Sequence, residues 1–143
     1  SIRVPLIVRD PRQPAEQRGG TNDEFVLNVD LAPTILAATG IEAPSTMQGR
    51  DFSPLYLAGE KPAWRDEFFY EHPTITSKNR IPSSQAVVRR DWKYVFWPEF
   101  DYEQLFDLSR DPDEVTNLAG EAAAAAQRER MRQRLAEWRA RVR

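Results

Sequence analysis

The sequence contains no cysteine and a single histidine, His72. Without cysteine, these 143 residues can form no disulfide, no thiolate metal site and no cysteine nucleophile. A zinc site with one histidine would consist almost entirely of carboxylates, which is unusual for zinc. The residue pattern also offers no Ser-His-Asp set. We therefore nominate no zinc centre and no catalytic triad in this chain.

Glycine and long apolar runs are also scarce. Six glycines stand against eleven prolines, and no apolar run approaches the ~18 residues that span a bilayer. Gly19 and Gly20 form a bare pair that lacks the helix pattern following a phosphate-binding loop. No signal-peptide pattern is visible. The sequence therefore predicts no phosphate loop and no membrane partner.

Charge is nearly balanced overall but unevenly distributed. The net charge is −2, although residues 121–143 carry seven Arg and three Glu and hence a local charge of +4. One interpretation is a solvated helix face that balances an acidic body. The other is an interaction module that binds nucleic acid or an acidic partner through this basic segment. A nucleic-acid arm more often carries its basic residues with Gly, Ser or aromatics between them, and we predict no nucleic-acid partner.

The first part of the chain predicts a strand, a loop and a helix. Residues 4–8 read as a short buried strand and residues 25–29 as a second one. Asp30 is the predicted N-cap of a helix over 31–39, which ends at Gly40. A further helical turn is expected from Ser53. A chain that opens directly in an apolar strand reads as a piece of something longer.

The second part predicts an α+β arrangement. The expected strands, joined in part by a tight hairpin at 90–92, are 67–71, 85–90, 93–97 and 104–108. A C-terminal helix follows, because the alanine run 122–126 favours helix and one helical face is apolar. That face consists of Met131, Leu135, Trp138 and Val142, with arginines on the other sides. The predicted fold is a small antiparallel sheet of about four strands packed against a long helix.

The stretch EQLFDLSRDPDEVTNLAG, residues 103–120, is the most acidic and resembles a calcium loop at first sight. Its spacing fails the EF-hand pattern, because neither Asp107 nor Asp111 has the required ligand and glycine positions after it. We interpret Asp107, Asp111 and Glu114 as capping and pairing groups. Lys93 or nearby arginines are the expected partners.

Five short motifs in order resemble the C-terminal third of type I sulfatases, of the arylsulfatase and N-sulfoglucosamine sulfohydrolase-like group. They are RVPLIV (3–8), NVDLAPTIL (28–36), MQGR (47–50), WKY (92–94), and LFDL with DPDE and NL (105–118). The resemblance covers essentially the whole chain. It implies a parent in the alkaline phosphatase superfamily that hydrolyses sulfate esters or sulfamates, with sulfated sugars or other sulfated small molecules as substrates.

In that family the nucleophile is a formylglycine and a calcium ion polarises the sulfate, both held by the N-terminal domain. This chain has no matching C/S-x-P-x-R motif. The resemblance therefore implies calcium and formylglycine for the full-length parent, no cofactor within this chain, and no catalytic residue here. It also implies that the chain is inactive alone and that its main partner is the missing N-terminal domain.

Two residues are candidates for substrate binding, since loops of the family's C-terminal subdomain reach the mouth of the active site. His72 ends the predicted strand 67–71 and precedes the polar loop 74–80, so its ring could hydrogen-bond a sugar hydroxyl or a carboxylate. Arg80 is the second candidate. The alternatives are a surface or capping histidine and a plain surface arginine.

The resemblance also divides the chain. Residues 1–62 are expected to be the tail of the sulfatase α/β domain, and 63–143 the C-terminal sheet and helix subdomain. A phosphonate monoester or phosphodiester hydrolase parent is the alternative within the superfamily. A periplasmic or secreted parent is compatible with the family, although the sequence leaves the compartment unknown. An apolar row of Phe68, Phe69, Tyr94 and Phe96 could remain uncovered and drive self-association.

Overall fold

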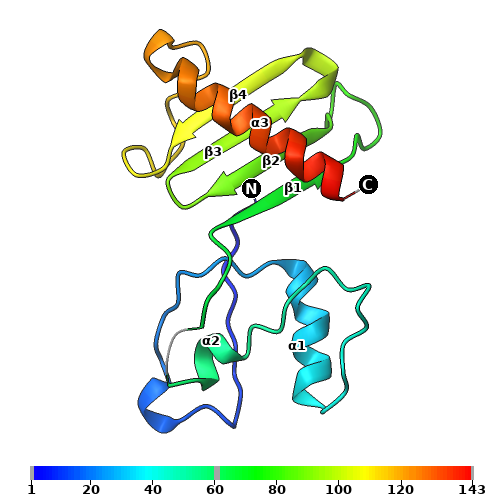
Figure 1. The fold of residues 1–143 in the computed structure, drawn as a ribbon, viewed down its shortest axis with the longest axis vertical. Coiled ribbons are helices and arrows are strands. Elements are labelled where there is room, and N and C mark those ends of the chain that lie inside the picture. The colour runs from blue at the N-terminus through cyan, green and yellow to red at the C-terminus, as the bar shows by residue number, and fades with distance from the viewer. Residues whose placement is uncertain (1, 60–61, 143) are drawn as a thin grey trace. The chain divides into compact units, whose positions relative to one another are not determined.

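A computed structural model describes residues 2–59 and 62–142 of the chain. The chain divides into two compact units, Ser1–Trp64 and Arg65–Arg143, which we call the N-terminal unit and the sheet unit. Figure 1 shows the elements of each unit, and each is described by itself. Within the described residues, no helix combines the length and the apolar character needed to cross a membrane.

The sheet unit contains four strands in the order β1-β2-β3-β4, all antiparallel to their neighbours. Their bounds are Glu67–His72 for β1, Ser84–Arg89 for β2, Trp92–Trp97 for β3 and Tyr102–Asp107 for β4. Each lies within two residues of its predicted place. The register sets Phe69, Val87, Tyr94 and Leu105 side by side across the sheet. The predicted α+β class, an antiparallel sheet with a C-terminal helix, is therefore confirmed.

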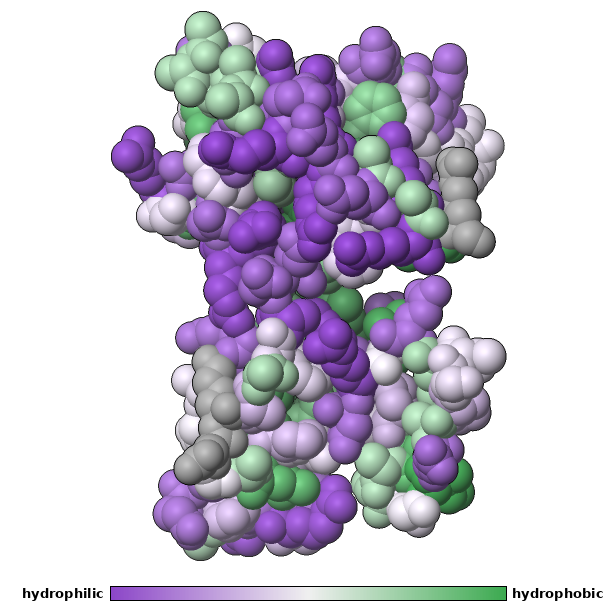
Figure 2. Space-filling view, in the orientation of Figure 1, coloured by the Kyte–Doolittle hydropathy of each residue, from purple (hydrophilic) through white to green (hydrophobic). Residues whose placement is uncertain are grey.

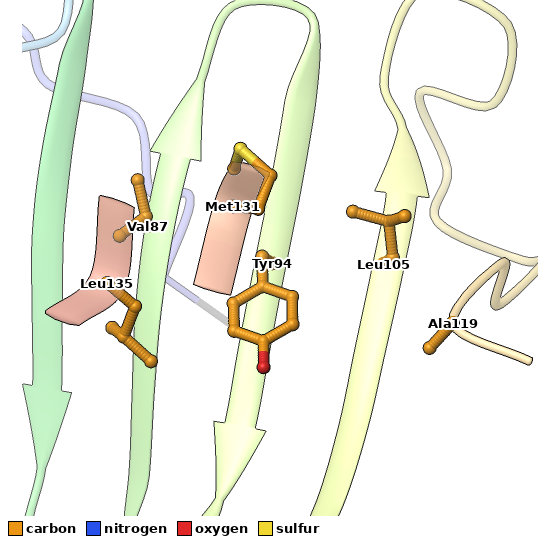
Figure 3. Close-up of a cluster of buried hydrophobic side chains, with 6 residues drawn as sticks. All are labelled: Val87, Tyr94, Leu105, Ala119, Met131 and Leu135. Atoms are coloured by element: carbon orange, nitrogen blue, oxygen red, sulfur yellow. The ribbon is translucent and has the colours of Figure 1, made fainter. Parts of the chain in front are cut away.

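Helix α3, Ala125–Arg141, lies across one face of this sheet (Figure 1). A 3-10 turn over Ala122–Ala124 leads into it. Met131 and Leu135 are 2% and 3% exposed, and they pack with Val87, Tyr94 and Leu105 as Figure 3 shows. Ala119 completes the cluster. Burial of this many apolar side chains is the main force that holds helix and sheet together.

The predicted apolar row is wrong in its placement. Phe69, Tyr94 and Phe96 lie on the face that α3 covers, and the Phe69 ring stacks on Trp138 with centroids 6.4 Å apart. Phe68 alternates to the other face. The row is therefore split between two faces and cannot form one exposed surface.

The arginines of α3 are not simply a solvated face, which corrects the sequence interpretation. Arg132 Nε donates to Glu103 Oε1 at 2.5 Å, and Arg134 Nε donates to Glu67 Oε1 at 2.6 Å. Arg139 Nε donates to Gln85 Oε1 at 2.6 Å and its guanidinium lies 5.2 Å from the Phe96 centroid. The long side chains reach from the flanks of the helix to polar groups on the sheet. Figure 2 shows that hydrophilic side chains nevertheless cover the outer surface over α3.

The N-terminal unit contains helix α1, Leu31–Ala38, and the short helix α2, Pro54–Leu57. Its described residues also form two 3-10 turns, Ala15–Gln17 and Asn28–Asp30. The end of α1 is as predicted, because Gly40 adopts a left-handed φ of 75°. The helical turn expected after Ser53 is likewise confirmed as α2.

The two strands predicted in the N-terminal unit are wrong. Residues 4–8 form no strand and are exposed, with Val4 at 76% and Ile7 at 92%. Residues 25–29 run as coil into the 3-10 turn. The physical reason is that a strand needs a neighbour for its backbone groups, and no described segment pairs with either stretch.

Asp30 has a different role from the predicted N-cap. It is fully buried, and its carboxylate accepts hydrogen bonds from Leu27 N at 2.7 Å and from Arg50 N at 2.8 Å. Neither donor belongs to the first turn of α1. A Cβ on Gly49 would lie 1.9 Å from the Val29 oxygen, so only glycine allows this close backbone approach. The NVDLAPT and MQGR stretches are thus the two sides of one contact.

Candidate functional site

The acidic stretch 103–120 is a structural turn. Asp111 accepts hydrogen bonds from Val115 N at 3.1 Å and Thr116 N at 2.8 Å, and Lys93 pairs with Glu114. Asp107 accepts hydrogen bonds from Ser109 N at 3.1 Å and from Ser109 Oγ at 2.7 Å. The bond from the Ser109 hydroxyl lowers the pKa of the Asp107 carboxyl. The predicted capping and pairing roles are confirmed. These carboxylates are occupied by backbone and side-chain donors within the stretch or on β3.

Asn117 fastens the end of this stretch to β4. Its Oδ1 accepts from Leu105 N at 2.9 Å and Ala119 N at 3.0 Å, while its Nδ2 donates to the Glu103 carbonyl at 3.1 Å. Leu118 N also donates to the Leu105 carbonyl at 2.8 Å. The Leu105 N–H and carbonyl and the Glu103 carbonyl, which lie along the outer side of β4, are thereby satisfied. This stretch therefore serves the fold of the sheet unit.

A hollow of about 460 Å³ in the N-terminal unit is a second candidate site. Apolar side chains of residues 6–8 and of α1 line most of it, and the pair Asp10–Arg12 lies at one side. The Asp10 carboxylate accepts from Arg12 Nη2 at 2.7 Å and from the Tyr56 hydroxyl at 3.1 Å. Hydrogen bonding by Arg12 holds the pKa of Asp10 well below its usual range. Such a carboxylate is a poor general base at neutral pH.

His72 is the last residue of β1, opposite Ser84 of β2. Alternation along β1 sends Glu67 and Phe69 toward α3, so Tyr70 and His72 lie on the other face. The His72 ring is half-buried and nearly parallel to Tyr70, with centroids 6.5 Å apart and 25° between the planes. The ring therefore has a fixed neighbour on one side and stands at the end of the sheet, where the β1–β2 connection leaves it.

Arg80 lies in that same connection, residues 73–83. The loop closes on itself through a bridge between Ile75 and Ile81, and Arg80 N donates to the Ser77 carbonyl at 3.0 Å. Thr76 has a left-handed φ of 68°. The Arg80 side chain is exposed and forms no ion pair within residues 2–59 and 62–142. The structure thus places both predicted residues on one hairpin, His72 at its base and Arg80 near its tip.

Glu99, which the sequence interpretation did not single out, connects to both ends of this loop. Its Oε1 accepts from Ser83 N at 3.0 Å and also from the Thr74 hydroxyl, and its Oε2 accepts from Ser83 Oγ at 2.6 Å. The hydrogen bonds from Ser83 and Thr74 lower the pKa of Glu99 to about 2. The register brings the 3-10 turn Pro98–Phe100 beside the start of β2, since Gln85 pairs with Phe96. No local motif links positions 74, 83 and 99.

The loop is basic, which bears on what it could bind. Residues 73–83 contain Lys78 and Arg80 but no acidic residue. Two cations and a histidine at one end of a sheet can attract an anionic ligand and hydrogen-bond its oxygens. The arrangement is that of a binding edge.

Comparisons with known proteins identify the chain. The family model "N-sulphoglucosamine sulphohydrolase, C-terminal" matches residues 1–141. The chain belongs to that family. It is 33% identical over 138 residues to N-acetylglucosamine-6-O-sulfatase of Bacteroides thetaiotaomicron, a match that covers 94% of this chain and 24% of the relative. The sulfatase resemblance drawn from the five motifs is confirmed.

Solved structures agree on the fold. A protein solved with its substrate D-glucosamine-2-N,6-O-disulfate is 29% identical and superposes with a TM-score of 0.67, covering 76% of this chain and 22% of that one. Phosphonate monoester hydrolase of Agrobacterium radiobacter is 27% identical with a TM-score of 0.62, covering 78% and 24%. The solved structures that this chain resembles thus include hydrolases of more than one ester class. This chain spans about a quarter of the length of such relatives.

The residues of this chain do not fit the metal and the modified nucleophile of family sulfatases. In the part of the chain that the structure describes, no group of three or more His, Cys, Asp or Glu side chains could hold a metal ion. The sequence has no cysteine from which formylglycine could be made and no serine in the corresponding motif. No step of a reaction can be derived from these residues.

Proposed function

We propose that the protein containing this chain hydrolyses sulfate esters or sulfamates of sugars, and that this chain supports its fold and the outer edge of its substrate pocket. Similarity to N-acetylglucosamine-6-O-sulfatase over 94% of the chain carries the proposal. The basic β1–β2 loop, with Lys78 and Arg80 and no acidic residue, supports it, since a sulfated sugar is an anion. Calcium and formylglycine are proposed to come from residues outside this chain.

In this proposal His72 and Arg80 contact the substrate from the C-terminal subdomain. The His72 ring hydrogen-bonds a sugar hydroxyl or carboxylate, and Arg80 faces a sulfate or carboxylate group. We further propose that residues 1–62 complete the sulfatase α/β domain and that 63–143 form the separate subdomain. The partner of this chain is then the N-terminal domain of its own protein.

The test uses the full-length protein and two groups of substrates. It is assayed on glucosamine-6-sulfate, N-sulfoglucosamine and an aryl sulfate, and in parallel on an aryl phosphonate monoester. Faster turnover of the sulfated sugars supports the proposal. Turnover of the phosphonate alone would favour the second candidate function, a phosphonate monoester hydrolase. That candidate is suggested by the 27% identity to the Agrobacterium radiobacter enzyme.

The role of His72 is tested in the same protein. We expect His72→Ala to lower kcat/KM on sulfated sugars about tenfold, because one hydrogen bond to a polar ligand is lost. Arg110→Ala, at an arginine whose side chain is 89% exposed in another loop, is the matched control and should change nothing. An unchanged kcat/KM for His72→Ala across sulfated sugars would remove His72 from the pocket.

The interaction-module alternative is weakened by the contacts of α3. Arg132, Arg134 and Arg139 bind groups of the sheet unit itself, and its Met131–Leu135–Trp138 stripe packs on the sheet. A helix used in this way is a structural element. Absence of binding to DNA or RNA at ~50 mM salt would exclude a nucleic-acid interaction module, since phosphate neutralisation is strongest at low salt.

A further inference from the structure

The β1–β2 loop has little structure of its own. Apart from the turn around Ser77, one bridge joins Ile75 to Ile81, and both side chains are 46% exposed. The loop contributes no side chain to the buried core of the sheet unit. A loop with few apolar contacts opens at low cost. Its geometry therefore depends on how its two ends are fixed.

Glu99 fixes both ends. Its carboxylate accepts a hydrogen bond from the Thr74 hydroxyl at the start of the loop. It also accepts hydrogen bonds from the backbone N–H and the hydroxyl of Ser83 at the end of the loop. All three donors are neutral. We call these three hydrogen bonds to Glu99 the clamp. Lys78 and Arg80 form no ion pair in the described part of the chain, so the clamp leaves both cations available. Had an arginine paired with Glu99, the loop would have lost the positive charge that suits a sulfated ligand.

We propose that Glu99 is a positioning residue for substrate selection: it holds the β1–β2 loop so that His72 and Arg80 meet a sulfated sugar in one arrangement. This inference rests on the proposed function. It predicts an effect on substrate affinity and selectivity, because Glu99 lies beside the loop and takes no part in bond breaking. A displaced loop weakens binding of the substrate and of the transition state alike, which raises KM and leaves kcat nearly unchanged.

The clamp itself is tested on this chain, without reference to activity. Glu99→Ala removes all three acceptor contacts, and we expect the Ser83 amide and its neighbours in residues 74–83 to exchange hydrogen at least about tenfold faster. Amides of β3 and α3 should keep their rates. Glu42→Ala, at an exposed carboxylate in the N-terminal unit, is the charge-matched control. Unchanged exchange in the loop of Glu99→Ala would overturn the clamp.

The positioning role is tested in the full-length protein. We expect Glu99→Ala to raise KM for sulfated glucosamine about tenfold and to leave kcat within about twofold, with little change on a small aryl sulfate that does not reach the loop. Glu99→Gln keeps a carbonyl acceptor for Ser83 N and should restore part of the affinity. The effects of Glu99→Ala and Arg80→Ala in a double variant should be less than additive, because Arg80 lies in the loop that Glu99 holds.

The positioning role of Glu99 and the proposed sulfatase function fail on different results. Additive effects in the double variant, or a fall in kcat on the aryl sulfate, would overturn positioning through the loop. A full-length protein with no activity on sulfated sugars would overturn the proposed function and with it the substrate role of Glu99. The exchange measurement on this chain would still establish whether Glu99 fastens the loop.

Discussion

The sheet unit buries Val87, Tyr94, Leu105, Met131 and Leu135 beneath a long helix, whereas the N-terminal unit buries Asp30, Thr34 and Ser53 beside Phe52. The first set is almost entirely apolar and the second is mostly polar. Apolar burial supplies stability in proportion to area, while buried polar groups fix geometry and contribute modestly in net terms. The sheet unit has its own core, and the N-terminal unit is shaped mainly by hydrogen bonds.

The largest expected effect tests the core of the sheet unit. Leu135→Ala should lower the free energy of unfolding by about 2–5 kcal/mol, because it removes a side chain that is 3% exposed and leaves a cavity. Urea unfolding followed by tryptophan fluorescence measures the change. Val115→Ala, at an 81% exposed position in the same unit, should stay within about 0.5 kcal/mol. Equal effects of the two variants would contradict the assigned core.

The second effect tests the polar contact of the N-terminal unit. Asp30→Ala leaves the Leu27 and Arg50 amides without their acceptor and should cost about 1–3 kcal/mol. The loss should be local, with faster amide exchange in residues 27–50 and unchanged rates in β2 and β3. Asp30→Asn retains one carbonyl oxygen and should lose less. Equal loss of protection in both units would show that they are not independently stabilised.

The third effect concerns exposed apolar surface in the N-terminal unit. The expected self-association stays a prediction, and the exposed residues Val4 and Ile7 are now its best location. Ile7→Lys should weaken self-association of this chain by about tenfold or more, since burying such a side chain contributes about 1.5–3 kcal/mol. Sedimentation velocity over a range of concentrations measures it. A monomer at every concentration would end the prediction, and Val115→Lys is the control in the sheet unit.

The smallest effect concerns the pH dependence of the sheet unit. Hydrogen bonds from Arg132 lower the pKa of Glu103 from 4.5, so this pair stabilises the fold above about pH 4.5 and loses its effect as pH falls through the lowered value. Arg132→Met should therefore reduce stability near neutral pH by about 1 kcal/mol and flatten its decline below pH 4.5. Arg130→Met, at an arginine whose side chain donates hydrogen bonds to Gln127 on the same helix, should leave the profile unchanged. A parallel profile for Arg132→Met would exclude the pair as a source of acid sensitivity.

The sheet unit was predicted well because the residue pattern within each strand and helix is enough to identify that element. Alternation located the four strands, and the apolar spacing of Met131, Leu135 and Trp138 located the covered side of α3. The same spacing could not reveal where the arginines reach. Arg132 and Glu103 are 29 residues apart, and their contact follows from the register of helix on sheet.

The N-terminal unit was predicted less well for a related reason. Residues 4–8 have the composition of a strand, but strand formation also needs a neighbouring strand, which local composition does not report. Asp30 precedes a helix as an N-cap does, yet its acceptors serve Leu27 and Arg50. In the candidate site, chain position suggested His72 and Arg80, while Glu99 became visible only through the strand register that brings it to Ser83.

The fastening of β4 by Asn117 has a consequence for how the sheet unit could be extended. Because Leu118 and Asn117 already occupy the Leu105 backbone groups, an additional strand could not pair with the centre of that edge. The opposite edge is β1, whose outer row pairs with no strand of the described chain. Growth of the sheet by an added strand is therefore directional, and a peptide or a grafted hairpin would have to join beside Phe69.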